Sequence, residues 1–334
     1  MFLKKKKKVV VIGGGTGTYT VLSGLKKYTR KIDITAIVAM TDSGGSTGRL
    51  RDEFGYLPVG DVRMALVALA KEGGENEALL RKLFLHRFNK GSEVGGHNFG
   101  NLLLVALTDI LGSEEQAIEA ASDVLRVSGK VIPVTKEKTQ LVAEYDDGVK
   151  VTGEHEIDEP QMERNTHRIR TLSVIPRAAV NPKAKEALES ADMVIFGPGD
   201  LYTSILANCV VDGFAAAISG SKGKLVFISN LMTKVGQTTG MGALEHVREL
   251  EHYIGRKPDC VLVNVAPMSE NLIARYAEGG EFPVVNNIEK DDTEVIAGDL
   301  VAVEEYRAPN GDALRRSLIR HDPSKLAETI IEML

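Results

Sequence analysis

The sequence has few cysteines and no excess of basic charge. Its two cysteines, Cys209 and Cys260, are too few for a disulfide framework, and each stands in an apolar run where a small hydrophobic side chain fits. The chain has 41 Lys and Arg against 46 Asp and Glu, which gives a formal net charge of −5. This balance provides no general basic field for nucleic acid or an anionic membrane.

Long apolar runs and a targeting segment are also lacking. Five lysines at 4–8 are followed by only four apolar residues at 9–12, whereas a secretory signal needs a longer apolar segment and a cleavage site. The lysines are most simply a solvated N-terminal arm. We therefore expect a cytoplasmic protein without a transmembrane segment.

Strand-like apolar runs alternate with helix-like spacing along the 334 residues, of which 43% are hydrophobic and 26% charged. Strands are predicted at 9–12, 32–38, 193–196, 225–229 and 260–263. Helices are predicted at 21–28, 62–70, 78–88, 102–111, 182–190 and 323–334. Asn181 and Asp322 are expected to cap the last two of these helices, because each precedes a proline at the first helical position. The alternation predicts a single α/β domain over 1–334 with a mainly parallel sheet and right-handed crossovers.

Residues 131–175 interrupt this alternation. Short β-rich pieces at 141–143 and 172–174, with a turn at Asp146-Asp147-Gly148, predict a small antiparallel β insertion. The acidic segment 154–164 is expected to form its polar tip.

Three glycine-rich loops each follow a predicted strand and precede a helix-like stretch, at 13–17, 44–51 and 197–200. In a parallel sheet such loops meet at the carboxyl edge, where bare backbone N–H groups and helix N-termini can face an anion. Thr16 and Ser46 add hydroxyl donors, and Arg49 adds a permanent charge suited to phosphate. The loops could equally be tight turns. Three on one edge favour a phosphate-rich site.

Neither standard nucleotide motif is present. Counted from Gly13 or from Gly15, the third glycine of G-x-G-x-x-G falls on Thr18 or Thr20. No Gly-Lys-Ser/Thr follows the second loop at P-loop spacing. A plain NAD site and a P-loop are therefore disfavoured.

Several polar residues beside the loops have two interpretations. Asp42, at the end of the second strand, could bind a ribose or a divalent cation, or cap the following loop. Asp61 could orient Arg63 toward the pocket, or form a local ion pair with it. His97 could contact a ring or sugar, although lone histidines are more often structural.

Five motifs in order along the chain resemble the CofD-like superfamily, and more closely its YvcK-type branch, the gluconeogenesis factors. The motifs are Gly13-Gly14-Gly15-Thr16-Gly17, Asp42-Ser43-Gly44-Gly45-Ser46-Thr47-Gly48-Arg49-Leu50-Arg51, Gly60-Asp61-Val62-Arg63, Gly96-His97-Asn98-Phe99-Gly100-Asn101 and Gly197-Pro198-Gly199-Asp200-Leu201-Tyr202-Thr203-Ser204.

The resemblance covers nearly the whole chain and implies a Rossmann-like three-layer α/β/α fold. It implies UDP-N-acetylglucosamine, or a related nucleotide, as the ligand. The branch is tied to carbon use, cell-wall precursor supply and cell shape. Its sister branch is the 2-phospho-L-lactate transferase, which moves a phospholactyl group from a nucleoside-diphosphate carrier to a deazaflavin.

The loops and the resemblance together give the expected ligand-binding residues. They are Gly13, Gly14, Gly15, Thr16, Gly17, Asp42, Ser43, Gly44, Gly45, Ser46, Arg49, Arg63, His97, Asn98, Asn101, Gly197, Pro198, Gly199, Asp200, Thr203, Ser204, Asn230, Thr233 and Arg320. No residue is assigned as catalytic unless the protein is a transferase, in which case Asp42 is the candidate. No obligatory cofactor and no metal ligand is assigned, although Mg²⁺ could assist.

The chain departs from the branch pattern at two places. Ser43 stands where the branch usually has a second aspartate, which removes a carboxylate and weakens the case for a metal there. Lys234 and Gln237 replace the Gln and Glu of a later loop. The added cation would suit a diphosphate, or be a change on a solvent face.

Two function classes therefore compete: a sensor that binds a UDP-sugar without turnover, and a phosphorus-group transferase. The sequence shows no Ser-His-Asp pattern and no metal-type histidine spacing, and we favour the sensor. The expected partners are the nucleotide-sugar, an unidentified regulatory protein and, in a homodimer, a second copy of the chain. Nucleic acid is not expected.

Overall fold

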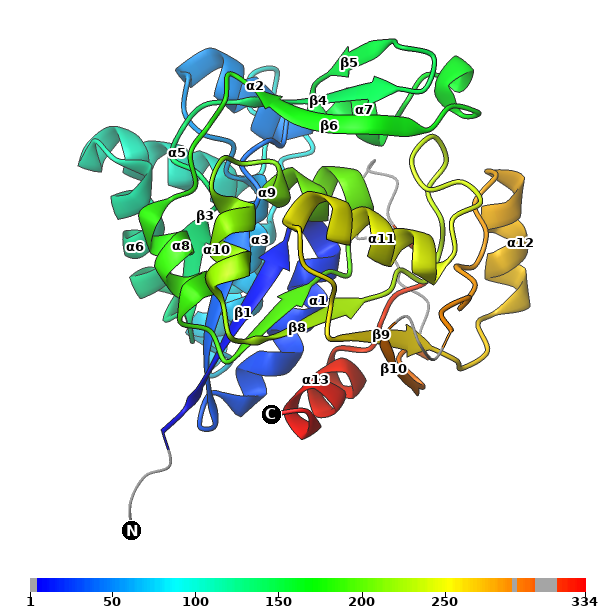
Figure 1. The fold of residues 1–334 in the computed structure, drawn as a ribbon. Helices are drawn as coiled ribbons and strands as arrows, with labels where there is room; N and C mark the ends of the chain where they lie inside the picture. Colours follow the sequence, from blue (N-terminus) through cyan, green and yellow to red (C-terminus); the bar gives the residue numbers. More distant parts are fainter. Residues whose placement is uncertain (1–4, 290–292, 304–316) are drawn as a thin grey trace.

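A computed structural model describes residues 5–289, 293–303 and 317–334. Its main sheet has the strand order β10-β9-β8-β7-β1-β2-β3, and every strand pairing in it is parallel (Figure 1). The strands are β1 (Lys7–Gly13), β2 (Ile32–Val38), β3 (Lys130–Pro133), β7 (Met193–Phe196), β8 (Lys224–Ile228), β9 (Cys260–Asn264) and β10 (Glu294–Gly298). The α/β fold with a mainly parallel sheet is confirmed.

Helices cover the two faces of the sheet in two groups. From β1 the chain proceeds to β2 and β3 on one side, whereas β7, β8 and β9 follow on the other, so right-handed crossovers place the two sets of helices on opposite faces. The first set includes α1 (Gly15–Leu25), α2 (Gly45–Phe54), α3 (Gly60–Leu69), α4 (Glu75–Leu85), α5 (Phe99–Leu111) and α6 (Glu114–Leu125). The direction in which successive strands are added to the sheet therefore reverses between β1 and β7.

The helices of the second set follow β6, β7 and β8. It contains α8 (Pro182–Glu189), a π-helix (Leu201–Leu206), α9 (Ala207–Cys209), α10 (Phe214–Gly220) and α11 (Ala243–Ile254), and α10 packs between α8 and α11. α12 (Glu270–Glu278) follows β9, and α13 (Pro323–Glu332) packs against α1. The caps predicted for α8 and α13 are confirmed: Asn181 accepts from the Lys183 N–H, and Asp322 from the Ser324 and Lys325 N–H groups.

The insertion forms a second, antiparallel sheet of order β5-β4-β6 above the carboxyl edge of the main sheet (Figure 1). Its strands are β4 (Gln140–Tyr145), β5 (Lys150–Thr152) and β6 (Ile169–Ile175). The predicted start at 131 is wrong, because residues 130–133 form β3, which pairs in parallel with β2. The insertion begins only after that strand.

The segment 154–164 is not a simple polar tip. It contains the short helix α7 (Glu154–Asp158) and a 3₁₀ turn (Met162–Arg164), and Ile157 is completely buried. That side chain fixes α7 against the core, since it is part of the main hydrophobic cluster. Glu154 and Asp158 of α7 are therefore held against the body of the protein, whereas Glu156 is exposed.

The core is the parallel sheet and the helices on its two faces. Val9, Val10, Val11 and Ile12 of β1 are each at most 2% exposed, as is typical of a central parallel strand. Cys209 and Cys260 are buried free thiols, as expected for packing residues. No helix among the described residues has the length and apolarity needed to cross a bilayer.

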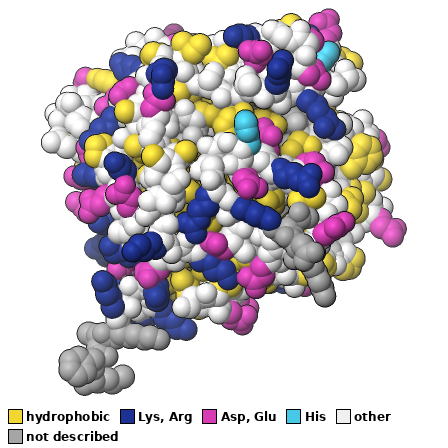
Figure 2. All heavy atoms as spheres, in the orientation of Figure 1, with side chains coloured by type: hydrophobic (Ala, Val, Ile, Leu, Met, Phe, Trp, Pro, Cys, Tyr) yellow, Lys and Arg dark blue, Asp and Glu magenta, His cyan; other side chains and the backbone are white. Residues whose placement is uncertain are grey.

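Other boundaries differ from the sequence prediction. α4 starts and ends three residues earlier than expected, and β10 was not predicted. Within the five-lysine run, Lys4 lies outside the described residues, whereas Lys7 and Lys8 already belong to β1, where the Lys7 ammonium pairs with Asp192 at 3.0 Å. On the face shown in Figure 2, basic and acidic side chains are interspersed.

Candidate functional site

A large cavity of ≈ 1010 Å³ lies at the carboxyl edge of the main sheet. The loops after β1, β2, β7 and β8 form its floor and sides, and the insertion forms one wall. In open α/β sheets, ligands bind outside the carboxyl ends of the strands where the strand order reverses, which here is between β1 and β7. Topology alone therefore makes this cavity the candidate site.

Most of the residues expected from the sequence line this cavity. They are Gly14, Gly15, Thr16, Gly17, Asp42, Gly44, Gly45, Ser46, Arg63, Asn101, Pro198, Gly199, Asp200, Thr203, Ser204, Asn230, Thr233 and Arg320. The three glycine loops thus converge, and two of them touch: a Cβ at Gly17 would collide with the Pro198 carbonyl oxygen. Gly17 is required by this close approach of two backbones.

Six expected residues do not line the cavity: Gly13, Ser43, Arg49, His97, Asn98 and Gly197. Several of them support the residues that do. His97 shares a 3.2 Å hydrogen bond with Ser46, and Asn98 caps α5 by accepting from the Asn101 N–H at 3.3 Å. Arg49 donates to the Gly95 carbonyl at 3.1 Å. Their positions fit a supporting role better than direct ligand contact.

Two backbone N–H groups of the glycine loops already have hydrogen-bond acceptors, whereas the sequence predicted that such groups would face an anion. The Gly15 N–H, at the start of α1, donates to Asp61 Oδ1 at 2.7 Å. The Gly44 N–H donates to Asp42 Oδ1 at 2.9 Å. Carboxylates therefore already occupy positions where the sequence suggested a phosphate.

Burial changes the ionisation of these two carboxyl groups. Burial and the negative charge of Asp42 raise the pKa of Asp61 to about 7. Burial also raises the pKa of Asp42, although the Gly44 N–H and Thr47 oppose the rise. Arg63 faces the same cavity, and its Nε donates to Asn101 Oδ1 at 2.8 Å.

The acidic wall contributed by α7 is the part of the site that the sequence interpretation missed. Glu154, His155, Asp158 and Glu159 line the cavity. Burial, followed by the charge of Asp42, raises the pKa of Glu154 well above its usual value. The isolated Ile157 within this acidic run was the signal that the segment packs inward.

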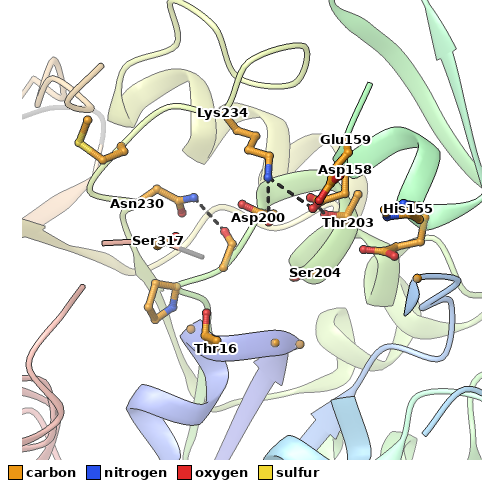
Figure 3. A pocket seen from close by; sticks show the side chains of 18 of the residues that line it. Thr16, His155, Asp158, Glu159, Asp200, Thr203, Ser204, Asn230, Lys234 and Ser317 are labelled. Carbon is orange, nitrogen blue, oxygen red and sulfur yellow. Dashed lines mark hydrogen bonds and ion pairs between the residues drawn. The ribbon is translucent and has the colours of Figure 1, made fainter. Parts of the chain in front are cut away.

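Asp158 joins the insertion to two loops of the body. Its Oδ1 accepts from Thr203 Oγ1 at 3.2 Å and from Gln237 Nε2 at 3.3 Å. Its Oδ2 lies 3.4 Å from Lys234 Nζ, which also lies 3.8 Å from Asp200 Oδ2 (Figure 3). Lys234 is therefore not on a free solvent face but between two carboxyl groups.

The two carboxyl groups beside Lys234 differ in ionisation. Burial, with the nearby Asp158, raises the pKa of Asp200 to about 7. Burial opposes ionisation of Asp158, but Lys234 and a hydrogen bond with Asp200 outweigh it and keep its pKa below the usual range. The charges of Asp200 and Asp158 raise the pKa of Lys234 despite its burial. Lys234 therefore pairs with Asp158 at the shorter distance and with Asp200 at the longer one.

The remaining wall comes from the loop after β8 and from the C-terminal segment. Asn230 donates from Nδ2 to the Gly199 carbonyl at 2.8 Å, while its buried Oδ1 has no partner among the described residues. His321 also lines the cavity, is 6% exposed, and has a buried Nε2 with no partner among the described residues. Burial lowers the pKa of His321 to about 4, so its ring is neutral.

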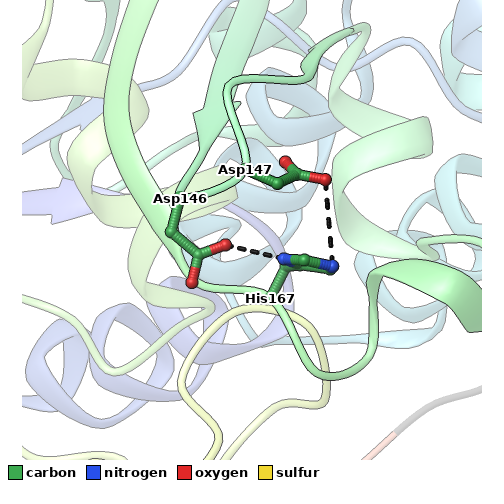
Figure 4. A group of neighbouring side chains, drawn as sticks. All are labelled: Asp146, Asp147 and His167. Atoms are coloured by element: carbon green, nitrogen blue, oxygen red, sulfur yellow. Dashed lines mark hydrogen bonds and ion pairs between the residues drawn. The ribbon is translucent and has the colours of Figure 1, made fainter.

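A second group of metal-type side chains lies on the hairpin of the insertion, away from the cavity. Asp146, Asp147 and His167 come close enough to share an ion (Figure 4). Asp147 is already paired with Arg164 at 2.6 Å, and His167 Nδ1 bonds Asp146 at 2.7 Å. This group is best described as a closed surface network that stabilises the turn.

Comparisons with known proteins agree with the geometry. Residues 9–301 match the family model described as 2-phospho-L-lactate transferase CofD. The chain is 43% identical over 319 residues to the "Putative gluconeogenesis factor" of Thermotoga maritima, covering 95% of this chain and 96% of that protein. It is 37% identical over 327 residues to the "Gluconeogenesis factor" of Bacillus subtilis, covering 96% of each.

A crystal structure of a Bacillus halodurans protein has the same fold. It superposes with a TM-score of 0.86 at 37% identity and covers 98% of this chain and 100% of that one.

Proposed function

This chain belongs to the CofD family, with the gluconeogenesis factors as its full-length relatives, and we propose that it binds UDP-N-acetylglucosamine as a regulatory ligand. In this proposal the protein links carbon metabolism to cell-wall precursor supply and cell shape. The observation that carries it is the cavity at the β1–β7 reversal, where three glycine loops meet. Its volume lies at the upper end of the range for small-molecule sites.

The distribution of charge supports an extended ligand with a charged middle and neutral ends. Arg63 and Arg320 can offset phosphate charge. The unpartnered atoms of Asn230 and His321 are neutral, and buried polar atoms of this kind call for a partner. A nucleobase would supply one. A nucleotide-sugar combines these groups in one molecule.

Carboxylates at the glycine loops support Mg²⁺ as a companion of the ligand. Asp42 and Asp61 present oxygen atoms of the kind Mg²⁺ prefers, in a cavity proposed to hold phosphate. When bound, the ion would neutralise charge between carboxylate and phosphate. Ser43 does not argue against this site, because its Oγ accepts from the His155 N–H at 2.9 Å and its side chain does not line the cavity.

Thermal stabilisation tests the proposed ligand. UDP-N-acetylglucosamine at a hundredfold excess over Kd is expected to raise the free energy of unfolding by about 2.7 kcal/mol. A panel of UDP-sugars, UDP, GTP and NAD gives the specificity. If NAD or GTP stabilises the protein and no UDP compound does, the proposed ligand is wrong.

The second candidate function is a transferase, favoured by the description of the matching family model and by Asp42 at the cavity floor. The full-length relatives are named for a metabolic role rather than a transfer reaction, so we propose binding without turnover. Long incubation with Mg²⁺ and a deazaflavin acceptor should return the nucleotide-sugar intact. Free nucleotide that accumulates with the native protein but not with Asp42→Asn would establish the transferase instead.

A further inference from the structure

Asp158, Asp200 and Lys234 come from three different parts of the chain and meet at one place in the cavity. Asp158 ends α7 of the insertion, Asp200 precedes the π-helix after β7, and Lys234 lies in the loop after β8 (Figure 3). Their side chains are 24%, 39% and 28% exposed, respectively, and all three line the cavity. They are therefore accessible to a ligand there.

The charges of these three groups offset one another. Lys234 balances Asp158, and Asp200 lies 3.8 Å from the same ammonium. A phosphate placed here would face two carboxyl groups, which like-charge repulsion disfavours. A hydroxyl group can donate to a carboxylate and accept from the ammonium at once. The arrangement therefore suits a neutral group that carries several hydroxyls.

We propose that Asp158, Asp200 and Lys234 form the subsite for the sugar hydroxyls of the ligand, so that the insertion determines sugar selectivity. This inference rests on the proposed function. It places the sugar at the insertion and the base at the wall formed by the loop after β8 and the C-terminal segment. The phosphates would lie between them, at the glycine loops.

The surroundings of the three residues agree with this orientation. Figure 3 places Asn230 and Ser317 on one side of Asp200 and Lys234, and His155 on the other. The unpartnered Asn230 Oδ1 thus lies on the side away from the insertion, where the base is expected. Thr16 of the first glycine loop lies below, where the phosphates are expected.

α7 is held in place by several contacts, so that the Asp158 carboxylate at its end can discriminate between sugars. The His155 N–H donates to Ser43 Oγ at 2.9 Å, and Gln237 Nε2 donates to the Ile157 carbonyl at 3.3 Å. Ile157 is fully buried. A carboxylate fixed on both sides in this way is preorganised for hydrogen bonding, which favours discrimination between ligands.

Calorimetric titration with UDP and with UDP-N-acetylglucosamine tests the subsite. Asp158→Asn keeps an acceptor for Thr203 and Gln237 but removes the charge that a sugar hydroxyl would meet. We expect roughly a 10-fold or greater loss of affinity for the nucleotide-sugar and less than about a threefold change for UDP. The matched control is Glu156→Gln, on the same helix but exposed and outside the cavity, which should change neither affinity.

Lys234→Gln is a second variant, for use if Asp158→Asn fails to fold by circular dichroism. It should show the same selective loss for the nucleotide-sugar. Equal losses for UDP and the nucleotide-sugar would place these groups beside the phosphates and overturn the inference, as would unchanged affinities. If the native protein binds neither compound, the proposed function itself fails, which is a different result.

Discussion

Two pairs of carboxyl groups face the same cavity, and they are balanced in different ways. Asp42 and Asp61 belong to the body, where they accept backbone N–H groups of the glycine loops. Asp158 of the insertion and Asp200 of the body flank Lys234. In each pair one member, Asp61 or Asp200, has its pKa raised to about 7.

This difference determines which chemical group each pair of carboxyl groups can bind. Asp158 and Asp200 already have an ammonium between them, so a neutral hydroxylated group can join without added charge. Asp42 and Asp61 also have a cation nearby, since the charge of Arg63 opposes the rise in both pKa values, but Glu154 adds a third carboxyl group that interacts with both. An incoming phosphate beside this pair therefore needs a cation or a proton to accompany it.

The largest expected effect comes from blocking the first glycine loop, whose Gly15 N–H donates to Asp61 of the first pair. Gly15 has φ +61°, and a Cβ there would meet only Ser204 Oγ, at 4.0 Å, so a side chain would extend into the cavity. Gly15→Val should reduce the affinity for UDP and for UDP-N-acetylglucosamine at least about 100-fold, because steric exclusion removes most of the binding energy. Calorimetry measures both affinities.

Gly148→Val is the matched control for backbone strain. Gly148 also has a positive φ, +82°, with no heavy atom within 4 Å of its Cβ position, and it lies on the hairpin turn of the insertion. The Gly148→Val variant should lose stability but bind UDP and UDP-N-acetylglucosamine as tightly as the native protein. Unchanged binding by Gly15→Val would mean that the ligand does not reach the loop beside Asp61, so that the first carboxyl pair does not contact it.

The next largest effect is the dependence of UDP binding on Mg²⁺, which we expect at the Asp42–Asp61 pair. In Mg²⁺ the native protein should bind UDP roughly 10-fold more tightly than in EDTA, because an ion offsets the charge of Asp42 and Asp61. Asp42→Asn should lose most of that difference, since it removes one oxygen ligand with charge. The exposed Asp123→Asn on α6 is the control and should keep it. Equal affinities with and without Mg²⁺ in the native protein would contradict this account.

The sequence predicted the body of the protein better than the insertion. β7 is a continuous apolar run and β2 begins with an alternating pattern that becomes apolar, so both strands were located to the residue. The caps Asn181 and Asp322 follow from local chemistry. β3 was assigned to the insertion because its pairing with β2 is set by tertiary contacts that periodicity does not report.

The site shows the same division. The three glycine loops can be recognised from the sequence alone, and residues of all three line the cavity. Asp158 was missed because an acidic segment usually lies in solvent, and only the packing of Ile157 turns it inward. Likewise no local pattern shows that Asp61 accepts the Gly15 N–H, a contact between residues 46 positions apart.

The smallest effect is on stability, and it follows from the raised pKa of Asp61. The folded protein holds a proton on Asp61 up to about pH 7, whereas the unfolded chain releases it near the ordinary aspartate pKa of 3.8. The native state therefore binds more protons between these values, and the free energy of unfolding falls as pH rises through this window. Asp61→Asn has no such group and keeps an acceptor for the Gly15 N–H. It should gain on the order of 1 kcal/mol over the native protein at pH 8 and little at pH 4.

Denaturant unfolding of the ligand-free protein at several pH values measures this gain, with the exposed Asp123→Asn as the control for the substitution itself. Asp200→Asn, compared with Asp61→Asn, tests whether Lys234 balances the second pair of carboxyl groups. Asp200→Asn removes a carboxyl group that lies 3.8 Å from Lys234, so relief of its raised pKa is offset by a lost contact with the ammonium. Its gain at pH 8 should be smaller than that of Asp61→Asn. If Asp200→Asn gains as much or more, Lys234 does not balance the second pair, and the distinction between the two pairs is lost.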